Sequence, residues 1–296
     1  MPAFAALPGL EELAIKELHH TYVTDCSVAE EVCQVLGRLR SLRLNIAHVH
    51  SRHPDDDYDE ETVHTFFSSF ASFWLMPTTA NLEHLTLYST LYFGFYPKCD
   101  ITSVHFPRLK SLALGNYTFV SDDQLSWILS HGSTLRELYL DDCPILHQVA
   151  VYNIDNQTSR IQRTALPLEL YKPHPQLDEK LLATYGTRWV DYLDAFNTGL
   201  PHLRHFRMGH GPSWWADGSP PFEQETSIEI GLSNAYMVFC DGMDQPFRDR
   251  MVYNIVDTGN EFGMGLMDGE VLEPSEEDKR ALRELLWDLG QDEPYI

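Results

Sequence analysis

The sequence predicts an α/β fold in which short parallel strands alternate with helices. One observation is a pattern of apolar residues that recurs between residues 7 and 208 and changes its spacing from three to two within each copy. Another is that the segments between the copies place apolar residues at helical spacing. A chain that passes repeatedly from strand to helix builds a parallel sheet with helices beside it. With 296 residues and 43% hydrophobic residues, the chain can form a large core.

The recurring pattern is clearest in FPRLKSLAL, residues 106–114. Phe106, Leu109, Leu112 and Leu114 are separated by three, three and two positions. The first part predicts a turn that places two apolar side chains in the core, and the second predicts a short strand whose leucines point inward. We count six copies, at residues 7–15, 36–44, 82–87, 106–114, 135–140 and 200–208.

The period of these copies is typical of leucine-rich repeats, which recur every 20–29 residues or so. Three of the five steps between copies are 29, 27 and 26 residues, whereas the steps of 43 and 68 residues require insertions. We therefore expect an irregular leucine-rich-repeat solenoid over residues 1–211, with insertions at about 50–61 and 144–180. In such an array each repeat buries its apolar face against its neighbours, and its strands line the concave side.

Helices are expected to return the chain between the strands. Ser121 is the expected N-cap of one of them, with Gly132 at its end, and Gly199 closes another. The four expected helices cover residues 27–36, 61–75, 121–132 and 187–199.

The long insertion and the C-terminal part depart from the repeat. Residues 144–180 contain four prolines and favour a loop that could contain one strand. Residues 212–296 form a C-terminal extension, in which 227–232 and 250–259 favour strands. The extension ends in a helix at 275–291. Its expected cap is Ser275, with Asp278 at the capping-box position and Leu282, Leu285, Leu286 and Leu289 on its apolar face. A solenoid needs an end piece that covers its last open face, and this extension is the candidate.

Composition narrows the class of partner. The net charge of −23 disfavours nucleic acid and anionic membranes. The five cysteines are odd in number and scattered, which favours a reducing compartment. The N-terminal residues do not resemble a signal peptide, and no apolar run reaches the roughly 18–20 residues of a membrane span. We therefore expect an intracellular protein of the cytoplasm or nucleus.

Three segments are candidate sites for metals or phosphates. His48, His50 and His53 offer imidazoles, but no cysteine lies at ligand spacing, and a solvated strand end is favoured. The acidic segment from Asp55 lacks the glycine and the final glutamate of a calcium loop. Residues 259–265 are glycine-rich but favour a hairpin turn. We expect no metal, no cofactor and no catalytic residue.

Partner-binding residues are expected on the concave face. Its outward positions mix aromatic, basic and small side chains in a strongly acidic chain, and such residues dominate the energetics of interfaces. The alternative is that these side chains are merely exposed. Trp214 and Trp215 are weaker candidates, because adjacent tryptophans more often pin a loop to the body. The concave-face candidates are Arg43, Asn45, His84, Thr86, Tyr88, Glu137, Tyr139, Asp141, His205 and Arg207.

The segment FPRLKSLALGNYTFVSDDQLSWILSHGSTLRELYLDDCPIL, residues 106–146, resembles the leucine-rich-repeat region of F-box proteins of filamentous fungi. LPHLRHFRMG and ALRELLWDLGQ are similar to the closing parts of those proteins. The resemblance implies the substrate-recognition part of an SCF-type ubiquitin ligase, which binds a protein substrate and performs no chemistry itself. Family members begin with an F-box, which is missing from this sequence. A Skp-type adaptor and a cullin are therefore implied only where an F-box is supplied.

Two other functions remain open. The first alternative is a stand-alone leucine-rich-repeat interaction scaffold unrelated to ubiquitin. The less favoured alternative is an enzyme with its site in the 144–180 insertion or in the C-terminal extension. An enzyme requires polar groups with perturbed pKa values gathered in a deep pocket.

Overall fold

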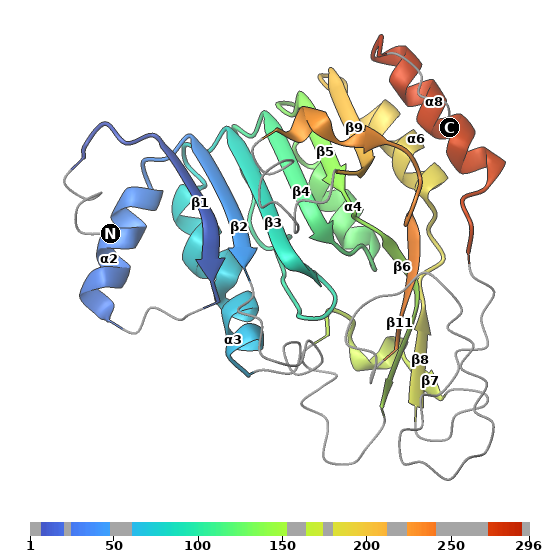
Figure 1. The fold of residues 1–296 in the computed structure, drawn as a ribbon, viewed down its shortest axis with the longest axis horizontal. Coiled ribbons are helices and arrows are strands. Elements are labelled where there is room, and N and C mark those ends of the chain that lie inside the picture. The colour runs from blue at the N-terminus through green and yellow to red at the C-terminus, as the bar shows by residue number, and fades with distance from the viewer. Residues whose placement is uncertain are drawn as a thin grey trace.

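The computed structural model of the chain describes residues 7–20, 25–47, 61–152, 164–173, 180–211, 224–240 and 272–291. It has an α/β fold with two mixed β-sheets that contain parallel strands, and with helices packed beside the larger sheet (Figure 1). The predicted α/β class is therefore confirmed. No helix in the described ranges is both long enough and apolar enough to cross a membrane.

The larger sheet has seven strands, and each of the six sequence copies contributes one of the first six. These six strands are parallel to their neighbours, whereas the last strand runs antiparallel along the sheet edge. The strand order is β1 (Glu12–His19), β2 (Ser41–Ala47), β3 (His84–Phe93), β4 (Ser111–Tyr117), β5 (Glu137–Asp141), β9 (His205–His210) and β10 (Glu229–Ile230).

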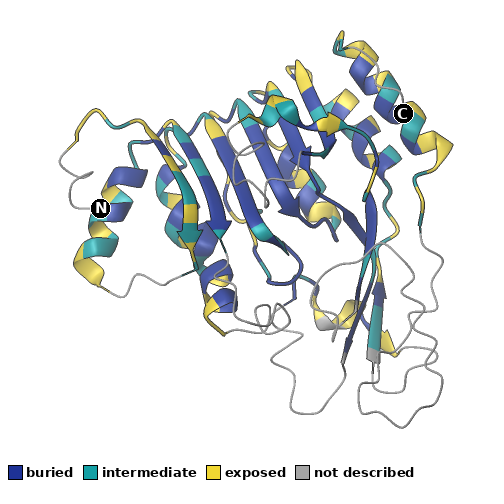
Figure 2. Cartoon of the chain, in the orientation of Figure 1, coloured by how far each residue is buried: buried dark blue, intermediate teal, exposed yellow. Residues whose placement is uncertain are grey.

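The inward leucines of the copies lie in register across this sheet. Leu42 is paired with Leu85, and Leu85 with Leu112, so that apolar side chains of successive strands stack in rows. The rows are buried apart from one half-buried residue of β1, Ile15, and they form the centre of the core (Figure 2). The two rows are Leu13, Leu42, Leu85, Leu112, Leu138, Phe206 and Ile15, Leu44, Leu87, Leu114, Leu140, Met208.

The strands are also tied together by a hydrogen-bond pattern that repeats at each step. The backbone N–H groups of Arg40 and Ser41 both donate to the carbonyl oxygen of Glu11, at 2.7 and 3.1 Å. The same paired donation recurs at the start of β3, β4, β5 and β9, with N–O distances of 2.7–3.1 Å. Each strand start is therefore positioned by the copy before it.

The predicted helices are present, with small shifts at their ends. Asp25 caps the first of them, because its carboxylate accepts from the N–H groups of Ser27 and Val28. The helix capped by Ser121 ends at Leu129, before the expected Gly132. The helices are α2 (Cys26–Leu36), α3 (Glu61–Phe70), α4 (Asp122–Leu129), α6 (Trp189–Gly199) and α8 (Glu276–Asp288), and a π-helical turn continues α3 over Ala71–Leu75.

The prediction that residues 144–180 form a loop that could contain one strand underestimates their strand content. This region supplies strands to a second sheet, in which β6 pairs in parallel with β11 and antiparallel with β8. Its prolines do not prevent this, because Pro144 precedes β6 and Pro173 lies in the edge strand. The order is β11 (Tyr236–Cys240), β6 (Ile145–Tyr152), β8 (Lys180–Thr184) and β7 (Lys172–Pro173).

The C-terminal extension contacts both sheets. β11 was not predicted, and of the strand expected at 227–232 only β10 is formed. The strand expected at 250–259 lies outside the described residues. The last helix, α8, begins at the predicted cap, Ser275, and packs against α6.

Two side chains of the last described segment bond to neighbouring elements. Asp278 accepts hydrogen bonds from the N–H of Val190 and the hydroxyl of Tyr236, at 2.7 and 2.9 Å. The side-chain amide of Gln291 bonds to both the N–H and the C=O of Phe206, and so pairs with the edge of β9 as a neighbouring strand would.

We predict that Leu112→Asp or Leu138→Asp unfolds much of the large sheet. Both leucines are fully buried in the stacked rows, so an aspartate there places an uncompensated charge in the core. The expected loss of stability exceeds about 3 kcal/mol. Thermal melting monitored by circular dichroism measures this loss of stability. Arg108→Asp, at an exposed position, is the control. Unchanged melting of either core variant would show that the stacked rows do not hold the sheet together.

Candidate partner-binding face

The outward side chains of the large sheet lie on one face, in three rows. We call this surface the sheet face. The register places Arg43 beside Thr86 and Tyr139 beside Arg207, while Asn45 and Tyr88 belong to the row that includes Asp141. The rows are Glu12, Ser41, His84, Ser111, Glu137, His205; Ala14, Arg43, Thr86, Ala113, Tyr139, Arg207; and Asn45, Tyr88, Gly115, Asp141, Gly209. The structure thus brings all ten predicted candidates together.

The sheet face is less open than the sequence predicts. Tyr88 and Asp141 are fully buried, and Asn45, Thr86 and Tyr139 are at most 9% exposed. Arg43, Glu137 and Arg207 are half-buried, and only His84 and His205 of the ten candidates are exposed. The alternative interpretation, that these side chains are merely exposed, therefore does not hold for most of them. A segment of the C-terminal extension, residues 224–230, contributes to this burial, because Glu225 and Ile228 contact the sheet face before β10 continues along the sheet edge. We call this segment the strap.

Glu225 of the strap binds to the basic side of the sheet face. Its carboxylate oxygen Oε1 accepts a hydrogen bond from the hydroxyl of Thr86 at 2.9 Å and forms an ion pair with Nη2 of Arg43 at 2.7 Å. The side chains of Glu225 and Arg43 are 16% and 29% exposed. Because the pair is partly shielded from water, its attraction is stronger than that of a fully exposed pair.

Ile228 of the strap fills an apolar site in the middle of the sheet face. Its side chain is fully buried against Tyr88, Ala113 and Tyr139, which form a cluster separate from the main core. The guanidinium of Arg207 donates to the backbone carbonyl of Ile228 at 2.8 Å. The strap is therefore held by one carboxylate, one apolar side chain and one carbonyl oxygen.

Two glycines make room for this arrangement. A Cβ atom at Gly115 would lie 2.3 Å from the ring of Tyr88, so glycine allows the phenol to lie across the strand. At Gly209, with a φ of +152°, a Cβ atom would lie 2.0 Å from the carbonyl oxygen of Glu229. Glycine at this position therefore allows β10 to approach β9 closely.

Burial raises the pKa of the Tyr88 hydroxyl, and the nearby Asp141 carboxylate raises it further.

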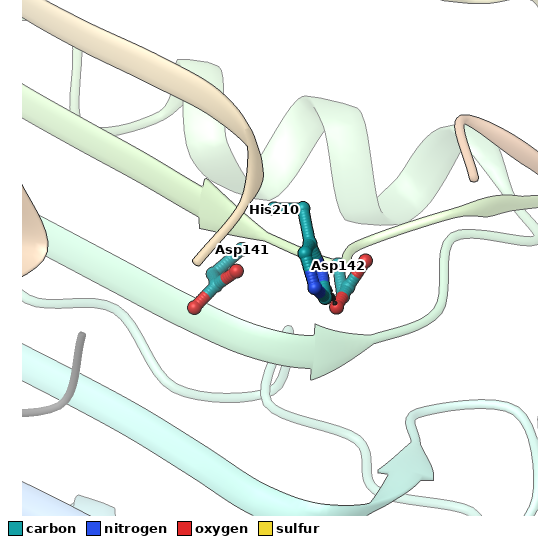
Figure 3. A group of neighbouring side chains, drawn as sticks. All are labelled: Asp141, Asp142 and His210. Carbon is teal, nitrogen blue, oxygen red and sulfur yellow. Dashed lines mark hydrogen bonds and ion pairs between the residues drawn. The ribbon is translucent and has the colours of Figure 1, made fainter. Parts of the chain in front are cut away.

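Asp141, Asp142 and His210 gather where β5 and β9 end (Figure 3). One oxygen of Asp141 accepts from the N–H of Gly211 at 2.6 Å, and Asp142 pairs with Nδ1 of His210. Asn234 also donates to Asp142, at 3.3 Å. Two carboxylates and an imidazole are potential ligands for a divalent cation. Because these hydrogen bonds already join the two strand ends, we assign no metal to the group.

Other predicted residues lie outside the described ranges. They are His48, His50 and His53, the acidic segment from Asp55, residues 259–265, and Trp214 with Trp215. Glu225 and Ile228 were missed by sequence reasoning. The sequence offered one indication of them. The predicted face is basic and aromatic, and it is therefore complementary to an acidic and apolar segment of the same chain.

A pocket lined partly by residues of the insertion region bears on the alternative that the chain is an enzyme. It lies between the start of α4 and the strand β8, and Asp122, Glu169, Lys172 and Tyr185 are among its lining residues. Burial raises the pKa of Tyr185 to about 12, which disfavours its use as a base at neutral pH. The hydroxyl of Tyr185 donates to Asp122 at 2.8 Å, a bond that joins the residue after β8 to α4.

Comparison of the chain with known family models, with curated proteins and with solved structures finds no match. The arguments that follow therefore rest on the residues and their geometry.

We predict that Asp141→Asn stabilises the protein near neutral pH. Burial, as the largest cause, raises the pKa of Asp141 from 3.8 to about 6. Since the folded-state pKa lies above the unfolded one, the contribution of this group to stability is greatest below pH 4 and is lost as the pH rises through 6. Asparagine keeps an oxygen for the N–H of Gly211 without the charge. The expected gain at pH 7.5 is roughly 1–3 kcal/mol.

Melting of the variant and of the wild type at pH 4 and pH 7.5 measures this effect, with the exposed Asp123→Asn as the control. The difference between variant and wild type should be larger at pH 7.5. A difference of equal size at both pH values would contradict the assignment of a buried, costly carboxylate.

Proposed function

We propose that this chain is a non-enzymatic protein-binding module, an irregular leucine-rich-repeat solenoid over about residues 1–211 that is closed by its C-terminal extension. The six in-register strands, the paired hydrogen bonds at their starts and the helices beside them support the solenoid. Gln291 and α8, which pack on β9 and α6, support the closing role of the extension.

One observation carries the binding function: the sheet face already holds a short segment of polypeptide, the strap, in which Glu225–Ser227 form a 3-10 helical turn. The strap lies on it with its carboxylate, its apolar side chain and its backbone carbonyl each bound by a residue predicted to contact partners. A surface that binds one peptide segment through side chains can bind another of similar chemistry.

The resemblance to F-box proteins of filamentous fungi makes substrate recognition for an SCF-type ubiquitin ligase the favoured role. In that role the sheet face binds the protein substrate. A Skp-type adaptor and a cullin join only through an F-box. The alternative is a stand-alone interaction scaffold unrelated to ubiquitin. An enzyme with its site in the insertion or the extension is the less favoured alternative.

We predict that a photo-crosslinking amino acid placed at His84 or at His205 captures a protein partner in native cells. Both positions are exposed on the outer row of the sheet face, so a probe there reaches a bound partner without disturbing the strap. The matched control is the same probe at Ser126, which is exposed on α4. Crosslinked proteins are identified by mass spectrometry.

Crosslinks from the sheet face but not from Ser126 are the expected result. Crosslinks from Ser126 alone, or from no position, would contradict a binding role for the sheet face. Recovery of a Skp-type adaptor and a cullin with the chain distinguishes the ligase role from the plain scaffold.

A further inference from the structure

The strap binds through three adjacent positions of the sheet face that differ in chemistry. Arg43 and Thr86 bind a carboxylate, Tyr88 and Tyr139 enclose an aliphatic side chain, and Arg207 binds a backbone carbonyl. The two strap side chains that are used, Glu225 and Ile228, are three residues apart. Thr226, which lies between them, is exposed, and Ser227 is half-buried. The sheet face therefore binds an acidic residue and, three positions later in the same segment, an aliphatic residue.

The aliphatic site is shaped by small residues. Ala113 packs in the same cluster as Ile228, and the absence of a side chain at Gly115 leaves space for the ring of Tyr88. The corresponding inward positions of the same strands carry leucines in closely packed rows. The one buried side chain of the strap, Ile228, thus packs with two tyrosines and Ala113 in a cluster separate from the main core.

The charges of the site select an acidic ligand. The chain as a whole has a net charge of −23, yet this part of the sheet face presents the guanidinium groups of Arg43 and Arg207. Acidic peptides are repelled by most of such a protein and attracted at this position.

We propose that the strap occupies a peptide-binding site, and that a partner segment with an acidic residue followed three positions later by an aliphatic residue binds there in its place. This inference rests on the proposed binding function and names its ligand. In the free protein the strap fills the site. A partner of this chemistry displaces Glu225 from Arg43 and Thr86, and Ile228 from the two tyrosines.

The experiment uses a fluorescent peptide with the sequence QETSIEIG, which is that of residues 224–231, and the full chain. In the variant Glu225→Gln with Ile228→Ser, the strap loses its bound carboxylate and its apolar side chain. We expect the peptide to bind this variant at least tenfold more tightly than the wild type, because the strap competes at a high effective concentration in the wild type. Fluorescence anisotropy measures both affinities.

Two controls test the chemistry of the site. Glu229→Gln changes an exposed acid of the strap and should behave as the wild type. A peptide with glutamine and serine in place of the first glutamate and the first isoleucine should not bind. Adding Arg43→Ala to the strap variant should weaken binding of the original peptide at least tenfold.

Peptide binding that is no tighter to the strap variant than to the wild type, with the melting temperature retained, overturns the inference. If the double variant fails to fold, Ile228→Ala alone provides the same comparison, and no gain in affinity there also overturns it. The outcome is separate from that of the crosslinking experiment. A partner crosslinked at His84 without peptide binding leaves the protein-binding function standing and makes the strap a fixed part of the fold.

Discussion

Five strands of the large sheet, β2, β3, β4, β5 and β9, start where two backbone N–H groups share one carbonyl oxygen of the preceding copy. Five such steps connect six strands, beginning with Arg40 and Ser41 at the carbonyl of Glu11 and ending with Arg204 and His205 at that of Arg136. This contact sets the register. Once the strand starts are aligned, every second residue of one strand lies beside its counterpart in the next. Register therefore decides both that the leucines stack on one side and that the candidate binding residues form rows on the other.

Where the side chains of the sheet face are apolar, another segment of the chain must bury them. Tyr88 and Tyr139 bring aromatic area to a side of the sheet that the helices do not cover. The strap supplies Ile228 against them, and Arg43 and Arg207 hold the strap on either side of this contact. The same three interactions give the extension a defined place on the sheet. They also leave the accessible part of the sheet face at its outer row, around His84 and His205.

Much of the large sheet could be predicted from the sequence, because the period of the leucines is a local property that each copy repeats. The six strands, the helices and the cap at Ser275 all follow from patterns within about fifteen residues. The second sheet could not be predicted in this way. β6 pairs with β11, whose five residues come from the extension, and the prolines of the insertion favoured a loop. The strap was missed for a related reason. Glu225 and Thr86 are 139 positions apart, and periodicity shows which side of a strand is outward without showing what lies on it.

Occupation by the strap has a quantitative consequence for any partner that uses the same residues. The affinity that a partner shows is its intrinsic affinity reduced by the fraction of molecules in which the site is free. The strap is part of the chain, so its effective concentration at the site does not fall on dilution. Tight binding then requires a partner that makes contacts beyond those of Glu225 and Ile228, and the outer row is where such contacts are available. A short peptide with only the acidic and aliphatic residues competes poorly with the intact strap. A folded protein that carries the same segment and also reaches His84 and His205 can displace it.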